Sequence, residues 1–202
     1  LENFIIYEKY NEVWDERKAE EISQIEGMLS MDIVADVSSS MYSEFDDMQR
    51  AIEGFVKETH TETALGLSTI GSIYERRQEF TSDKNAIVNA VWNLECDGLT
   101  SLYQSLYSSV IYTASAEGAR CVVAFTDGMN VPYGVGYDYD AQDVIDVSLY
   151  YQVPVYIIGI GSNVDSSALR TVAETTGGAY YANKTVYDLK TVYRDIYEAQ
   201  GR

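Results

Sequence analysis

The sequence is poor in the residues that many enzymes use for covalent chemistry. Its 202 residues include one histidine, His60, and two cysteines, Cys96 and Cys121. A cysteine nucleophile needs a base to activate it, and we find no histidine placed to activate either cysteine. The chain also lacks a Gly-x-Ser-x-Gly elbow and a phosphate-binding loop. We therefore expect no catalytic residues and no enzyme activity.

Positive charge and long apolar runs are also scarce. The chain has 14 Lys and Arg residues against 32 Asp and Glu residues, a formal net charge of −18. Such a surface repels phosphate backbones and anionic lipid headgroups, so nucleic acid is not an expected partner. No apolar run approaches the roughly 20 residues that span a bilayer, so direct membrane insertion is not expected either. The same negative field favours a bound cation.

The two cysteines are predicted to be free thiols. Cys121 opens an apolar run that ends at Asp127, and an extended strand of that length separates the two residues by about 20 Å. If Cys96 lies near the Asp127 end, a disulfide between the cysteines cannot form. Cysteine usage therefore leaves the redox compartment open.

The sequence does contain a regular alternation of strand and helix patterns. Apolar runs predict strands at 31–35, 63–70, 73–80, 122–126, 153–160 and 179–182. Helical spacing of apolar residues fills the connections, beginning with residues 45–56. The alternation predicts an α/β fold, with helices on both faces of a doubly wound, mainly parallel six-stranded sheet. Because the connection at Gly71-Ser72 is short, we expect one antiparallel strand at the sheet edge.

The length favours a single folded domain, which we place at residues 30–202. Residues 1–29 precede it and carry Tyr10, Val13, Trp14 and Ile22 at roughly helical spacing among many glutamates. We predict a helical extension packed outside the domain, or a linker. The pattern does not separate these two possibilities.

A cluster of oxygen-bearing side chains follows the first predicted strand. The segment Asp36-Val37-Ser38-Ser39-Ser40 places a carboxylate and several hydroxyls within five residues. Short oxygen ligands of this kind suit a hard divalent cation. Aspartate and serine after a strand are also common turn and helix-capping residues, so both readings stand for this segment alone.

Two further segments favour the metal reading. The fourth predicted strand also ends in an aspartate, Asp127, and parallel neighbouring strands present their carboxyl ends at one rim of the sheet. Thr100 begins a predicted helix after a glycine and can reach the same rim. Two carboxylates and three hydroxyls would then converge from three separate segments. Turn chemistry does not explain that convergence.

With these segments in place, the sequence resembles the von Willebrand factor type A (vWA) domain family. The segments Asp36–Ser40, Thr100 and Thr126-Asp127-Gly128 match the three parts of the family's metal-ion-dependent adhesion site (MIDAS) in order and spacing. The likeness extends over about residues 31–198 and is greatest to bacterial members. It implies that Ser38, Ser40 and Thr100 ligate Mg²⁺, with Mn²⁺ or Ca²⁺ as possible substitutes. It implies further that Asp36 and Asp127 bind the ion directly or through water.

The resemblance also implies a function. One coordination position would stay open for an acidic side chain of a protein partner, so we expect a metal-dependent protein-binding or adhesion module at a bacterial surface. The alternative is an intracellular assembly module of an ATPase or metal-insertion complex that uses the same metal site, and a cytoplasmic location goes with it. The loop 129–140, with Tyr133, Tyr137 and Tyr139, would flank the site as binding surface or as a plain solvent loop.

His60 does not change this expectation. It lies just beyond the first predicted helix, about 25 Å from the metal end at roughly 1.5 Å per residue. We expect it to be a surface residue rather than a general base.

Overall fold

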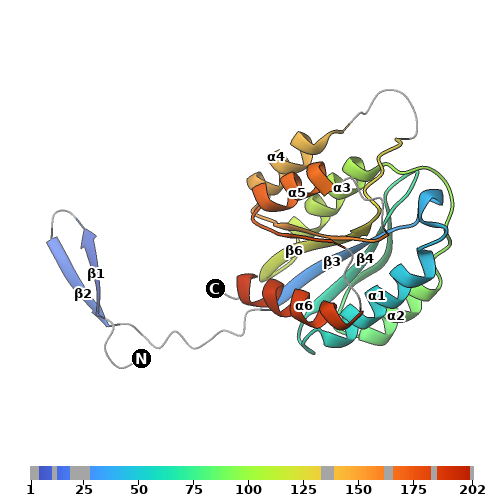
Figure 1. Cartoon of the computed structure of the whole chain (residues 1–202). Coiled ribbons are helices and arrows are strands. Elements are labelled where there is room, and N and C mark those ends of the chain that lie inside the picture. Colours follow the sequence, from blue (N-terminus) through green and yellow to red (C-terminus); the bar gives the residue numbers. More distant parts are fainter. Residues whose placement is uncertain are drawn as a thin grey trace.

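The computed structural model describes residues 5–10, 13–18, 28–132, 139–161, 166–182 and 186–200. Within these ranges, strands and helices alternate through one α/β unit, and a separate two-stranded sheet lies nearer the N-terminus (Figure 1). None of the described helices is both long and apolar enough to cross a membrane.

The central sheet of the α/β unit has the predicted topology. Its strand order is β5-β4-β3-β6-β7-β8, and only β5 runs antiparallel to its neighbour, at the edge. The predicted mainly parallel six-stranded sheet is therefore confirmed. The strands are β3 (Leu29–Asp36), β4 (Ala64–Ile70), β5 (Glu75–Thr81), β6 (Ala119–Thr126), β7 (Val155–Gly159) and β8 (Tyr180–Tyr181).

Helices cover both faces of this sheet, as predicted. Figure 1 shows α3, α4 and α5 on one face and α1, α2 and α6 on the other. The helical elements are η1 (Ser39–Met41), α1 (Phe45–Glu58), α2 (Lys84–Trp92), α3 (Leu102–Ala114), α4 (Ala141–Tyr151), α5 (Ser166–Thr175) and α6 (Val186–Gln200). The sheet is thus buried on both sides, which suits its near-continuous apolar strands.

Two cores result from the two-residue period of the strands. On β3, Ile33 and Ala35 belong to the core under α1, α2 and α6, whereas Val34 belongs to the core under α3, α4 and α5. On β6, Val123 and Phe125 face the first core. The same strands thus contribute side chains to both cores, and a polar side chain buried in them needs a hydrogen-bond partner within the protein.

Within residues 1–29, for which a helical extension or a linker was predicted, the described residues 5–10 and 13–18 form strands rather than a helix. Strands β1 (Ile5–Tyr10) and β2 (Val13–Lys18) pair antiparallel, with Tyr10 opposite Val13. Residues three positions apart share one face of a helix, but they can also be cross-strand partners at a hairpin, so their spacing does not distinguish the two. Aromatic and β-branched residues in both runs favour strands. Ile22 lies outside the described residues, and the division into extension and domain stays a prediction.

Both cysteines are free thiols, as predicted. Cys121 is buried in the core on β6, and Cys96 is half-buried in the connection before α3. Burial raises the pKa of both thiols, so neither is primed as a nucleophile.

Candidate functional site

The candidate site lies at the carboxyl ends of β3 and β6. Asp36 is the last residue of β3, and Asp127 follows β6 directly. The two strands pair in parallel, with Ala35 opposite Phe125. Both aspartates therefore reach the same rim of the sheet, as predicted, and the rim is where ligands bind in open α/β sheets.

Asp36 is a buried carboxylate with three hydrogen-bond donors. Its Oδ1 accepts from the backbone amide of Ser38 at 3.1 Å and from the Ser38 hydroxyl at 2.6 Å, and its Oδ2 accepts from the Thr126 hydroxyl at 2.6 Å. Burial raises the pKa of Asp36 to about 6 despite these donors, and the charge of Asp127 pushes it the same way.

The serines extend this network toward the surface. The Ser38 and Ser40 hydroxyl oxygens lie 3.1 Å apart, with Ser38 buried and Ser40 exposed. Neither hydroxyl caps a helix, because η1 and α1 both begin without a side-chain capping bond. The capping reading of this segment is therefore wrong. The hydroxyls point instead into a chain of oxygens that starts at Asp36.

Asp127 opens into a pocket of about 180 Å³. Ser40 lines the same pocket, which thus joins two of the predicted ligands from separate segments. The backbone amide of Met129 donates to Asp127 Oδ1 at 3.0 Å and fixes one side of the carboxylate. Glu44 also lines the pocket. This acid was not predicted from the sequence, where its only signal was its position just ahead of the first helix.

Thr100 is buried, and its segment is hydrogen-bonded to the loop after β3 and to the loop after β6. Its backbone exchanges two hydrogen bonds with Val131, at 3.1 and 2.8 Å. Just before it, the carbonyl of Gly98 accepts from the amide of Ser39 at 3.0 Å. The segment of Thr100 is thus held against the loop after β3 and the loop after β6. The three predicted segments converge.

Thr126 belongs to a motif recognised in the sequence, but it was not predicted to be a site residue. It is fully buried, and its hydroxyl donates to Asp36 and accepts from the amide of Gly128 at 2.9 Å. It therefore orients Asp36 and shapes the turn that carries Asp127. The Thr-Asp-Gly sequence was the available signal.

The donor set fits a small hard cation. Two carboxylates and three hydroxyls supply only oxygen, which Mg²⁺ and Ca²⁺ prefer, and Mg²⁺ keeps water in the positions that protein leaves open. In the part of the chain that the structure describes, no three side chains of His, Cys, Asp and Glu form a metal cluster. The predicted donor set contains two such side chains, Asp36 and Asp127, and hydroxyls make up the rest.

Part of the loop 129–140 lies outside the described residues, including Tyr133 and Tyr137. Tyr139 is described, and its ring packs against that of Tyr107 on α3, with 4.6 Å between the ring centres. This tyrosine therefore packs against α3.

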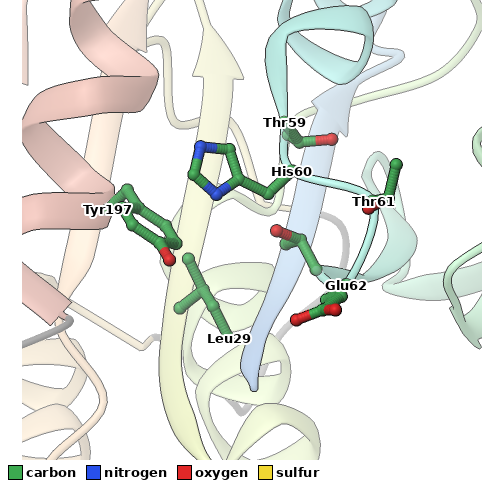
Figure 2. Close-up of a pocket in the computed structure, with 7 residues that line it drawn as sticks. Leu29, Thr59, His60, Thr61, Glu62 and Tyr197 are labelled. Atoms are coloured by element: carbon green, nitrogen blue, oxygen red, sulfur yellow. The ribbon is translucent and has the colours of Figure 1, made fainter. Parts of the chain in front are cut away.

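A second cleft, of about 350 Å³, lies at the opposite end of the sheet (Figure 2). It is lined by Leu29 at the start of β3, by Thr59–Thr63 ahead of β4, and by Tyr197 of α6. His60 is exposed there, with its ring centre 4.2 Å from that of Tyr197. The expected surface position of His60 is confirmed, and His60 is at the far end of the strands from Asp36.

Comparison with known families agrees with this fold. The family model of the von Willebrand factor type A domain matches residues 32–195. This chain belongs to the vWA domain family. The match runs from β3 into α6 and includes Asp36, Thr100 and Asp127. A comparison with curated proteins found no match to this vWA domain.

Solved structures share the vWA fold at low sequence identity. An aerotolerance-related membrane protein from Bacteroides fragilis has a TM-score of 0.72 at 16% identity, covering 84% of this chain and 98% of that chain. BatB from Bacteroides thetaiotaomicron has a TM-score of 0.69 at 14% identity, with 85% and 98% covered. The PilB minor pilin from Streptococcus sanguinis has a TM-score of 0.66 at 15% identity, with 87% and 61% covered. At these identities the likeness shows the fold alone.

Proposed function

We propose that this vWA domain is a metal-dependent protein-binding module. Ser38, Ser40 and Thr100 would hold a Mg²⁺ ion through their hydroxyls, and Asp36 and Asp127 would hold it directly or through water. The observation that carries the proposal is the oxygen network from buried Asp36 to exposed Ser40, which opens into one pocket with Asp127. An acidic side chain of the partner would complete the coordination.

The ligand chemistry explains why an acid is the expected partner group. A bound Mg²⁺ would supply the positive charge that a partner's carboxylate needs at this rim. The hydroxyl ligands are neutral, so only Asp36 and Asp127 offset the charge of the ion. Without the ion, these two acids and Glu44 in the same pocket would repel a partner's Asp or Glu. The partner contact is therefore expected to disappear when the metal is removed.

A surface or extracellular role follows from the same proposal. One structural neighbour is a minor pilin, and another is a membrane protein. These names belong to proteins that share only the fold, and they support, for this chain, an adhesion-type role at the bacterial surface. Catalysis is not part of the proposal, and the absence of enzyme activity stays a prediction.

Calorimetric titration with Mg²⁺ tests the metal site. The wild-type domain is expected to bind Mg²⁺, and Asp127→Ala is expected to bind at least tenfold more weakly, because it loses a carboxylate at the pocket. Asp46→Ala is the matched control. Asp46 is an exposed acid in the first turn of α1. Its ion pair with Arg50, at 3.7 Å, contributes little to the stability of the fold because it is exposed to solvent.

The Asp46→Ala control distinguishes direct binding of Mg²⁺ by Asp127 from the general attraction of a cation to a negatively charged protein. If Asp46→Ala weakens Mg²⁺ binding as much as Asp127→Ala does, the field alone accounts for the affinity. Equal Mg²⁺ affinity of the wild type and Asp127→Ala, with unchanged circular dichroism spectra, would contradict the proposal.

A further inference from the structure

Exposed apolar side chains surround the candidate metal site. Large apolar residues that are 40% to 81% exposed occur in four of the segments that build this rim, 37–44, 71–74, 95–101 and 127–132. They are Tyr42, Ile73, Leu99, Met129 and Val131. Scattered exposed apolar residues are ordinary, but a group that frames one site marks an interaction surface.

Hydrogen bonds tie these residues into two neighbouring groups. The amide of Leu99 donates to the Ser72 hydroxyl at 2.9 Å, which places Leu99 beside Ile73. The next residue, Thr100, pairs through its backbone with Val131. Ile73 and Val131 therefore lie next to the segment Leu99-Thr100, on the connections after β4 and β6.

The second group lies on the side of Asp127. Met129 lines the same pocket as Ser40 and Asp127. Tyr42 follows η1 directly, and its amide donates to the carbonyl of Ser39 at 3.3 Å. Exposed apolar side chains thus lie on the three segments that supply the predicted ligands, and Ile73 adds one from the connection between β4 and β5.

The charged residues of the described rim segments are all negative. In the described rim segments 37–44, 71–74, 95–101, 127–132 and 160–161, the charged residues are acids only, and no Lys or Arg occurs. They are Glu44, Glu95, Asp97 and Asp127. A bound ion would attract one carboxylate at the centre, while the surrounding acids repel any other carboxylate of the partner.

We infer that the partner of this rim presents one Asp or Glu flanked by apolar side chains, with no second acid nearby. This inference rests on the metal-dependent binding proposed above and specifies its partner. The central carboxylate meets the metal, and the flanking side chains cover the exposed apolar residues Tyr42, Ile73, Leu99, Met129 and Val131. An acid-rich segment does not fit this surface.

Selection from a random peptide library displayed on phage tests the inference. The immobilised domain is exposed to the library in Mg²⁺, and bound phage are eluted with EDTA. The selected peptides are expected to carry a single Asp or Glu, with apolar residues within two positions of it and few other acids. Enrichment of acid-rich peptides without apolar flanks would overturn the inference and leave the metal-dependent function standing.

Two surface variants make the test specific to the rim. The triple variant Tyr42→Ser, Ile73→Ser, Leu99→Ser removes exposed apolar groups around the site but leaves the pocket of Asp127 unchanged. The control, Leu149→Ser with Tyr150→Ser, removes exposed apolar groups at the end of α4, which leads to the start of β7 at the opposite end of the sheet.

The rim variant is expected to bind Mg²⁺ like the wild type but to bind the selected peptides at least tenfold more weakly, and the control to match the wild type in both. Equal peptide affinity of the rim variant and the control would overturn the inference. Absence of Mg²⁺ binding by the wild type would instead overturn the proposed function on which it rests.

Discussion

Two aspartates of β3 show how position decides what a buried acid does. Asp36 lies at the strand end beside the pocket, and Asp32 lies within the strand, where its carboxylate accepts from Ser109 at 2.6 Å and from Ser68 at 3.1 Å. Both are fully buried. Burial raises the pKa of Asp32 to about 7, although the hydrogen bonds from Ser109 and Ser68 lower it. In the folded protein, the Asp32 side chain is therefore protonated and uncharged below about pH 7.

The first prediction concerns the pH dependence of stability. The pKa of Asp32 rises from 3.8 to about 7 on folding, so between these pH values the folded protein binds more protons than the unfolded chain. Protonated Asp32 therefore adds its full contribution to the free energy of unfolding below about pH 4. This contribution, up to ~4 kcal/mol, is lost as the pH rises toward 7. Asp32→Asn removes this contribution. Denaturant unfolding at pH 4.5, 6 and 7.5 should show the free energy of unfolding of the variant rising relative to the wild type. A constant difference between the two proteins would contradict this.

The second prediction concerns Thr126. Thr126→Val keeps the shape but removes the hydroxyl that donates to Asp36 and accepts from Gly128. We expect Mg²⁺ affinity to fall about 10- to 100-fold, as for other groups that orient metal ligands, and the free energy of unfolding to fall by about 1–3 kcal/mol.

Thr113→Val is the matched control for Thr126→Val. Thr113 is also fully buried, but its hydroxyl has no hydrogen-bond partner among the residues that the structure describes. Its replacement by valine should leave Mg²⁺ affinity unchanged and should not reduce the free energy of unfolding. Calorimetry and denaturant unfolding measure both quantities. Similar losses in both variants would show that the Thr126 hydroxyl has no special role.

At the element scale, the turn from α5 to β8 shows why two adjacent glycines are needed. Helix α5 ends at Thr175, two residues before Gly177-Gly178. Gly177 has a φ of +84°, which favours glycine, although a Cβ there would meet nothing within 4 Å. At Gly178 a Cβ would lie 2.1 Å from the carbonyl oxygen of Val155. The first glycine serves backbone conformation and the second serves close packing on β7.

The third prediction separates these two roles. Gly177→Ala is expected to cost about 1 kcal/mol of stability, from its left-handed backbone. Gly178→Ala is expected to cost about 3 kcal/mol, because β7 or the turn must shift to admit the methyl group. Thermal unfolding of both variants measures the difference. Equal losses would mean that the turn relaxes freely around residue 178.

Most elements of the domain were predictable, because their periodicity reflects burial directly. Strands buried on both faces read as apolar runs, and α1 buries Phe45, Met48 and Ile52 at helical spacing. The hairpin of β1 and β2 was not predictable from spacing, because Tyr10 and Val13 satisfy both a helix face and a cross-strand pair. The role of the serine hydroxyls was equally undecided, since capping and bonding to Asp36 use the same residues.

At the scale of the whole molecule, the candidate site depends on topology that joins distant segments. Asp36, Thr100 and Asp127 come together because β3 pairs with β6 and because the connection before α3 crosses the rim. The rule that parallel strands present their carboxyl ends at one rim, together with the family resemblance, supplied this grouping from sequence. Side-chain exposure did not follow from it, so Glu44 in the pocket and the apolar rim emerged only from the structure. The domain thus combines a predictable scaffold with a surface that spacing cannot predict.

The most direct test of the central claim is a crystal structure of the domain grown in Mn²⁺, with data collected where manganese scatters anomalously. We predict one strong anomalous peak at ligand distance from the hydroxyl oxygens of Ser38, Ser40 and Thr100, close to Asp36 and Asp127. Water or an acidic group from a neighbouring molecule is expected to fill the remaining position. A peak held by other side chains, or no peak at this rim, would contradict the metal site.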